Sequence, residues 1–122
     1  MFSKSLLAAV SAMMCFGAVS AQITGTATRG FSGTTTCGCP SSNGPFAISI
    51  PAGFFNARVC CQDTITVNYN GKSVQAILSG VYDAQAGTTN IELTDAPFSV
   101  LQDNASQQTI SPVTWEFDQS PH

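Results

Sequence analysis

Charge is scarce in this chain. Only 9% of the 122 residues are charged, and four Lys and Arg stand against seven Asp and Glu. So few cations cannot form a basic patch, so we expect neither nucleic acid nor an anionic membrane surface as a partner. A weakly charged surface rich in Ser, Thr, Asn and Gln suits an uncharged ligand such as a glycan.

Histidine is almost absent as well. His122 is the only one, and it stands at the end of the sequence, where we expect the chain to be frayed. A Ser-His-Asp triad therefore has no candidate base.

Long hydrophobic runs are also missing. The apolar segment near the start is interrupted by Ser11, and it is too short to cross a bilayer, which takes about 20 residues. Lys4 precedes this segment and small residues at Ser20 and Ala21 follow it, which is the pattern of a secretory signal peptide at residues 1–21. We expect cleavage after Ala21 and a secreted, monomeric, single domain at residues 22–122.

Cysteine is present in a distinctive arrangement. Cys15 would leave with the signal, and Cys37, Cys39, Cys60 and Cys61 would remain, an even number that implies two disulfides in an exported chain. Adjacent cysteines rarely bond each other without strain, so the CGC pair should join the CC pair. Two pairings satisfy this condition, and both stay open. A zinc site on the same thiols is the alternative, but these spacings suit zinc poorly, so we expect no metal and no other cofactor.

Strand patterns dominate residues 22–122. Apolar and polar residues alternate over residues 64–69, and Asn70-Gly71 predicts a tight hairpin turn before a second strand at residues 73–78. One short helix is predicted from residue 95 to about residue 101, with the Thr94 hydroxyl as its N-terminal cap.

Five segments resemble, in the same order, the double-psi β-barrel of expansins. They are GTATRGF (25–31), FAISIPAGFFN (46–56), CCQDTITV (60–67), NIELTDAPFSVL (90–101) and PVTWEF (112–117). The resemblance implies an all-β fold, a six-stranded double-psi β-barrel with one or two short helices. It also implies that residues 46–56 form a helical turn that packs Ile48, Ile50, Phe54 and Phe55 into the core.

The resemblance also suggests where a ligand binds. Related barrels that cleave glycans use paired carboxylates as acid and base. Glu92 matches one acidic position of the expansin pattern and is the one catalytic candidate, whereas Gly80 stands at the other. With that pair broken, we do not expect hydrolysis. The candidate ligand-binding residues are Thr28, Tyr82, Asp83 and Glu92.

Two functions follow as expectations. The resemblance implies a secreted protein that binds or loosens cell-wall polysaccharide without hydrolysing it. The alternative is an effector or protease-inhibitor-like module that binds a host or wall protein through loops at residues 30–36 and 41–45. Asn104-Ala105-Ser106 is an N-glycosylation sequon and predicts a glycan on Asn104.

Overall fold

The computed structural model describes residues 22–32, 34–82 and 88–122 of the chain. The predicted signal peptide and the candidate residue Asp83 lie outside the described residues.

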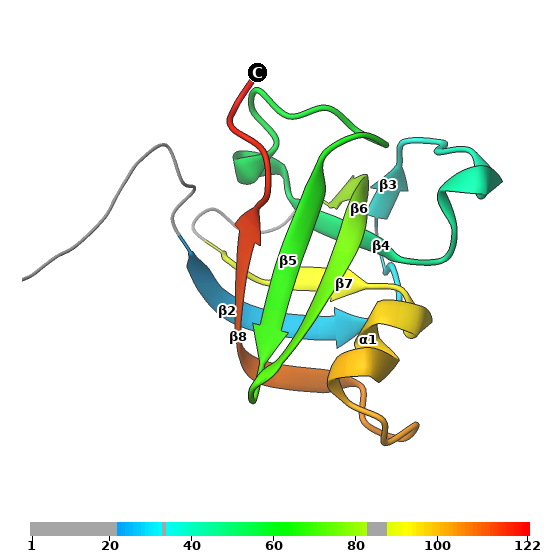
Figure 1. Ribbon diagram of the computed structural model, residues 1–122, viewed down its shortest axis with the longest axis vertical. Helices are drawn as coiled ribbons and strands as arrows, with labels where there is room; N and C mark the ends of the chain where they lie inside the picture. The colour runs from blue at the N-terminus through cyan, green and yellow to red at the C-terminus, as the bar shows by residue number, and fades with distance from the viewer. Residues whose placement is uncertain (1–21, 33, 83–87) are drawn as a thin grey trace, which may run out of the picture.

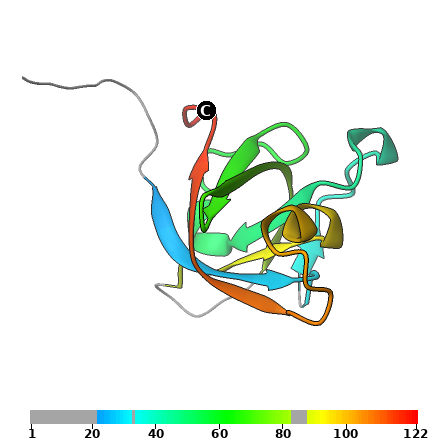
Figure 2. The ribbon, with the colours of Figure 1, turned by 60° about the horizontal axis from the view of Figure 1, so that its bottom comes forward.

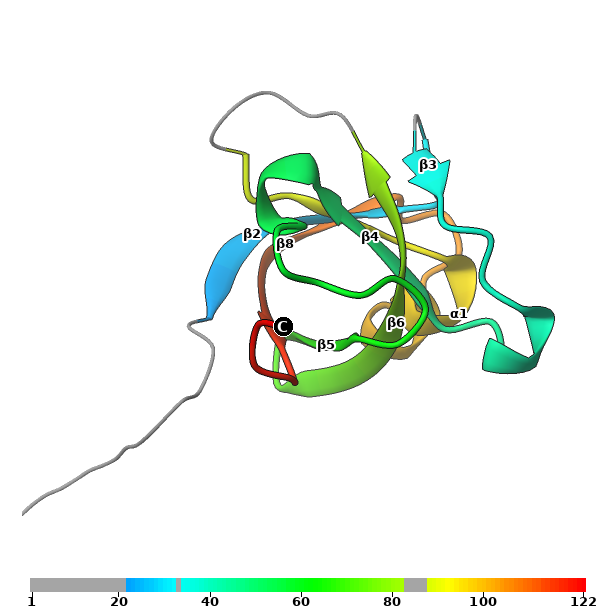
Figure 3. The same ribbon diagram turned by 90° about the horizontal axis from the view of Figure 1, so that it is seen from above.

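Six strands close into a barrel (Figure 1). Around the ring the order is β6, β4, β7, β2, β8 and β5, and β5 pairs back with β6. Figure 3 views this ring along another direction. The predicted all-β, six-stranded barrel is therefore confirmed. The strands are β2 (Ile23–Arg29), β4 (Ala47–Pro51), β5 (Thr64–Tyr69), β6 (Lys72–Tyr82), β7 (Ile91–Leu93) and β8 (Thr109–Phe117).

The strand pairs are mixed in direction. β2 with β7 and β4 with β6 are parallel, whereas β2 with β8, β4 with β7 and β5 with both neighbours are antiparallel. β2 and β8 lie side by side over most of their length (Figure 2). A short seventh strand, β3 (Thr34–Thr36), pairs only with the far end of β6 and stands outside the ring.

The hairpin between β5 and β6 is confirmed. Asn70 and Gly71 both have positive φ, 51° and 83°, which is the requirement of the type I′ turn that suits a twisted hairpin. β6 continues past the predicted end at residue 78, because its last residues leave β5 and pair with β3 on one side and β4 on the other.

The barrel interior is filled by apolar side chains from every strand of the ring. Trp115 and Phe98 are the largest fully buried side chains, and the indole Nε1 of Trp115 donates to the Thr89 carbonyl at 2.9 Å. Helix α1 (Asp95–Leu101) contributes Phe98 and Leu101 to this core. No described helix is long and apolar enough to cross a membrane.

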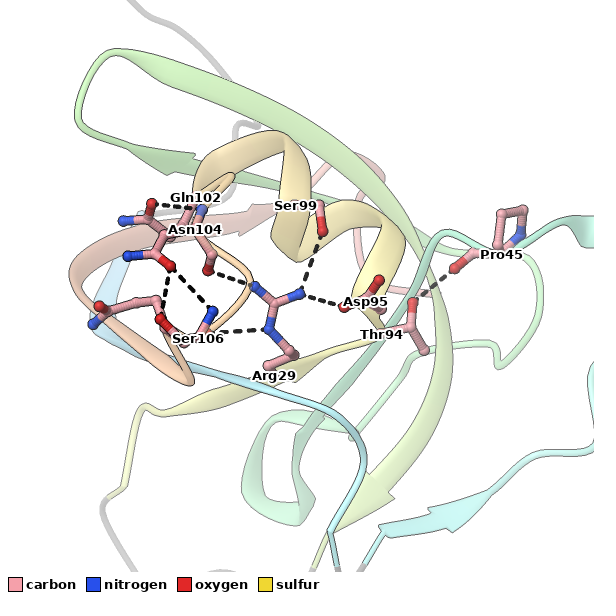
Figure 4. A network of polar contacts seen from close by, with 9 residues as sticks. Arg29, Pro45, Thr94, Asp95, Ser99, Gln102, Asn104 and Ser106 are labelled. Carbon is pink, nitrogen blue, oxygen red and sulfur yellow. Dashed lines mark hydrogen bonds and ion pairs between the residues drawn. The ribbon is translucent and has the colours of Figure 1, made fainter.

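Helix α1 has the predicted bounds, but its predicted cap is wrong. The Thr94 side chain makes no capping hydrogen bond. Its hydroxyl instead donates to the Pro45 carbonyl at 2.7 Å (Figure 4). The same hydroxyl accepts from the Ala47 amide at 3.1 Å. The start of β4 offers this hydroxyl backbone partners, so Thr94 ties α1 to β4.

The predicted helical turn in residues 46–56 is largely wrong. β4 forms there because it hydrogen-bonds to β6 on one side and to β7 on the other, and only η3 (Ala52–Phe54) makes a single 3-10 turn. Ile48 and Ile50 are in the core as expected. Phe54 and Phe55 are half-buried at its margin.

The disulfides join Cys37 to Cys60 and Cys39 to Cys61. The predicted link between the CGC and CC pairs is confirmed, and one of the two open pairings is selected. All four thiols are used in these bonds, so the zinc alternative has no ligands left. The bridges fasten the segment between β3 and β4 to the loop before β5.

The chain end is held in place, so the expected fraying of His122 is wrong. Its Nε2 lies 2.7 Å from Oδ1 of Asp63, and its amide donates to the Ala57 carbonyl at 2.9 Å. Asp63 is only 1% exposed, and a buried carboxylate needs such partners. The Val59 amide supplies another at 3.2 Å.

Candidate functional site

A line of small and polar positions crosses four neighbouring strands on the outer face of the barrel. Thr28 in β2 lies opposite Glu92 in β7, Glu92 lies opposite Ser49 in β4, and Ser49 lies opposite Gly80 in β6. Directly opposed residues share one face of a sheet, and the residues flanking this line in β4 and β7 are all buried in the core. We call these four positions the polar row. It brings together two predicted site residues, Thr28 and Glu92.

Tyr82 belongs to the same neighbourhood. It follows Gly80 by two residues in β6, so it lies on the same face as the polar row. Its hydroxyl donates to the Asn90 carbonyl. Burial and, to a smaller extent, the negative charge of Glu92 raise the pKa of Tyr82 to about 12, so the phenol is neutral at physiological pH.

A short segment covers the polar row. We call it the strap, and it consists of Ser32 and β3. The Ser32 amide donates to Oε2 of Glu92 at 3.2 Å, and the Thr34 hydroxyl donates to Oε1. Because the single proton of the Thr34 hydroxyl is donated to Glu92, Ser49 is the donor in the 3.1 Å contact between its Oγ and the Thr34 hydroxyl oxygen. Both oxygens of Glu92 are occupied, and the residue is only 8% exposed.

Gly80 stands where the resemblance places the second acid, and the strap fills the space beside it. A Cβ at Gly80 would lie 2.5 Å from the Thr34 methyl carbon and 3.2 Å from the Thr35 carbonyl oxygen. No side chain fits there while the strap is in place. Among the described residues, the polar row therefore offers the single carboxylate Glu92, and acid–base catalysis across a glycosidic bond needs two.

Sequence reasoning named the loop at residues 30–36 only as a protein contact, and it missed that Ser32 and Thr34 hydrogen-bond Glu92 and that Ser49 belongs to the same network. Ser49 had a signal, because it is the one hydroxyl residue in the apolar run of β4 and a buried hydroxyl needs a partner. Thr34 had none, since its contact with Glu92 joins residues 58 apart in the chain.

A second feature lies beside the strap. The segment between β3 and β4, which carries η2 (Ser41–Asn43), stands off the barrel (Figure 3). Between this segment and the outer face of β4 and β6 is an open cavity of about 260 Å³. None of its lining residues is charged. They are Phe31, Thr36, Gly38, Cys39, Pro40, Ser41, Asn43, Gly44, Phe46, Ala47, Ile77 and Ser79.

Arg29 is the charged residue nearest to Thr28 in the sequence, but it is fully engaged (Figure 4). Its guanidinium pairs with Asp95 and donates to Oγ of Ser99 at 3.3 Å and to the Asn104 carbonyl at 3.2 Å. It also lies 4.3 Å from the centre of the Phe98 ring. With a side chain only 12% exposed, Arg29 holds the loop after α1 rather than offering a free cation to a ligand.

The predicted glycosylation site lies on that loop. Asn104 is exposed, and its Oδ1 accepts from the amide and the hydroxyl of Ser106 at 3.1 and 2.8 Å. This exposed position is accessible to a glycan, and glycosylation of Asn104 stays a prediction.

Neither a protein-family model nor a curated protein sequence matches the chain. Solved structures do. A papain inhibitor from Streptomyces has a TM-score of 0.65 and 22% identity, over 83% of this chain and 97% of the inhibitor. An expansin from Clavibacter michiganensis has a TM-score of 0.60 and 15% identity, and a mutant of it in complex with cellohexaose has 0.59 and 13%. Each match covers 84% of this chain but 52% of the expansin. The expansin-like double-psi β-barrel is thus confirmed as the fold.

Proposed function

We propose that this chain is a secreted, monomeric protein-binding module that inhibits a papain-like cysteine protease. The contact surface consists of the strap and the loop at residues 41–45. The observation that carries the proposal is the closure of the polar row: the Ser32 amide and the Thr34 hydroxyl occupy both oxygens of Glu92, so the predicted glycan-binding carboxylate is already satisfied.

The extent of the structural similarity supports the same function. The likeness extends over nearly the whole papain inhibitor but over only about half of the expansin. The fold of that inhibitor is therefore present nearly in full in this chain, although the identity is too low to transfer a function by itself.

The proposed contact loops are cross-linked to the loop before β5, which favours binding. Cys37–Cys60 and Cys39–Cys61 fasten the chain between the strap and the loop at residues 41–45, and Nδ2 of Asn43 donates to the Cys61 carbonyl at 3.2 Å. A loop that is already ordered loses less conformational entropy on binding. The same bridges suit the oxidising conditions outside the cell, as a secreted inhibitor requires.

Polysaccharide binding remains the second candidate, because the expansin of the same fold has a structure with cellohexaose. In that case the strap would lift, and Thr28, Tyr82, Asp83 and Glu92 would hydrogen-bond the sugar chain. Thr28 is already partly exposed. This candidate requires breaking the bonds of the strap to Glu92, which the first does not.

Papain itself tests the proposal. Residues 22–122, with both disulfides formed, are titrated into papain while cleavage of a fluorogenic peptide is followed. We expect saturable inhibition by the wild type and a loss of about tenfold or more for Ser42→Arg, which places a bulky charge on the exposed loop. Ser73→Arg is the matched control, because Ser73 is exposed at the β5–β6 hairpin.

The same preparations are incubated with insoluble cellulose, chitin and wall extract. Full papain activity together with retention on one of these polysaccharides would reject the protease proposal and favour the second candidate. Release of reducing sugar would contradict both.

A further inference from the structure

We infer that the cavity beneath residues 38–44 is a pocket that receives one large apolar side chain, such as Leu or Phe, from the partner protein. The inference rests on the proposed function, because it names the chemical group that the partner inserts. The side of the cavity that the barrel contributes, Phe46, Ala47, Ile77 and Ser79, consists of residues that the sequence did not indicate as a site.

The lining determines which kind of group can enter. Ala47 and Ile77, opposed across β4 and β6, form the apolar part contributed by the barrel strands, and Phe31, Pro40 and Phe46 add further apolar surface. Hydroxyl and amide groups, including those of Ser41 and Asn43, are also present. Because no lining residue is charged, a charged group would lose its water without gaining a partner, whereas an apolar group would gain from burial.

The size points to a single side chain. At about 260 Å³ the cavity is smaller than typical small-molecule sites, which occupy about 300 to 1,000 Å³. A sugar chain of several units would not fit within it. One Leu or Phe side chain would.

The cavity is built from segments that are fixed on both sides. Cys39–Cys61 and the Asn43 bond to Cys61 hold the outer segment, whose turn is closed by the Gly44 amide donating to the Ser41 carbonyl at 3.0 Å. The inner side is held by the Ile77 amide, which donates to the Phe46 carbonyl at 2.9 Å. A pocket with fixed walls is ready for its occupant before binding.

The position agrees with the proposed contact surface. Thr36 belongs to the strap and lines the cavity, and Ser41 and Gly44 line it from the other proposed contact loop. A partner that covers both loops therefore also covers the cavity, and a side chain projecting from its centre would meet the opening.

Capped amino acids test the pocket without any protease. The ¹⁵N-labelled protein (residues 22–122) is titrated with the amides of N-acetyl-Phe, N-acetyl-Leu, N-acetyl-Lys and N-acetyl-Asp, and amide chemical shifts are recorded. We expect saturable shifts at Gly38, Gly44 and Ser79 with the Phe and Leu probes and none with the charged probes. Equal shifts with all four probes, no shifts in the lining, or shifts there with cellohexaose would overturn the inference.

A pair of matched variants sharpens the test. Ala47→Leu adds bulk inside the cavity, whereas Ala52→Leu makes the same change at an exposed residue of η3 that does not line it. We expect Ala47→Leu to weaken the Phe probe by about tenfold or more and Ala52→Leu to leave it unchanged. Circular dichroism is used to check that both variants are folded. If one of them is not, the titration of the wild type still tests the pocket.

Papain inhibition by the same variants separates the two proposals. Probe binding without papain inhibition supports the pocket and overturns papain-like proteases as the partner. Papain inhibition that Ala47→Leu leaves intact, with no probe binding by the wild type, overturns the pocket and leaves the proposed function standing.

Discussion

The polar row and the cavity meet at β3 but differ in what they leave open. At the polar row, Glu92 and Ser49 are bonded to the chain's own strap. At the cavity, apolar surface from Phe31, Phe46 and Ile77 lines an opening that the described chain leaves unfilled. The comparison teaches that a cluster of polar residues in the right place is available to a ligand only if the protein does not satisfy it internally.

Removing Cys39–Cys61 should have the largest effect and should act on the cavity side. Changing both cysteines to Ser frees the segment over the cavity, and loss of a bridge with a sequence separation of 22 should cost about 3 kcal/mol of unfolding free energy. Urea unfolding measures the cost, and the Phe probe should no longer bind. Peptide mapping of the wild type without reduction should show both bridges and no free thiol, and two free thiols would contradict the account.

Removing the carboxylate of Glu92 should act on the polar row. Glu92→Ala leaves the Ser32 amide and the Thr34 hydroxyl without their acceptor, which should cost about 2 to 3 kcal/mol of unfolding free energy. Glu92→Gln keeps one acceptor oxygen and should cost less. The control is Glu116→Ala, a partly exposed carboxylate on β8, with an expected change within about 0.5 kcal/mol. If Glu92→Ala is as stable as the wild type, the strap is not held through this residue.

Asn104 offers a surface that belongs to neither region. In a eukaryotic secretory host we expect a glycan there, which intact mass would detect and which Asn104→Gln would remove. The glycan should leave papain inhibition and probe binding unchanged, since Asn104 neither lines the cavity nor belongs to the strap. An unmodified mass from such a host would count against the site.

Tyr82 should give the smallest effect at neutral pH and a visible one in alkali. The pKa of Tyr82 is raised from 10.0 to about 12 in the folded protein. Its contribution to the free energy of unfolding is therefore fully present below pH 10 and is lost as the pH rises toward 12. Ultraviolet titration of the folded protein should show a component near pH 12 that Tyr82→Phe removes. Ionisation of this tyrosine near pH 10 would mean that it is neither buried nor close to Glu92.

Local features of the fold were predictable from the sequence. Asn70-Gly71 requires positive φ at two successive residues, and a hairpin turn supplies it, so the motif alone predicts β5 and β6. The bounds of the short helix α1 were likewise predicted from its own residues, although its cap was not. The positions of the cysteines predicted that the CGC pair bonds to the CC pair. They did not predict which cysteine bonds to which, because both alternatives close loops of similar length.

Features that depend on distant contacts were not predictable. Residues 46–56 were expected to form a helical turn, but two neighbouring strands draw β4 into the sheet. Thr94 was expected to cap α1, but its hydroxyl donates to the Pro45 carbonyl instead. His122 was expected to be frayed, but its side chain lies against Asp63. The resemblance named Thr28 and Glu92 as candidate ligand-binding residues, and the two lie opposite each other across β2 and β7, but it gave no sign that Thr34 would hydrogen-bond the carboxylate.

Hydrogen–deuterium exchange on the papain complex tests the central claim most directly, because it reports separately on the two regions. The account predicts slower exchange in the segment over the cavity, residues 36–46, when papain is added, and no change in β7 with either papain or cellohexaose. Protection of β7 by cellohexaose, with papain leaving residues 36–46 unaffected, would contradict it.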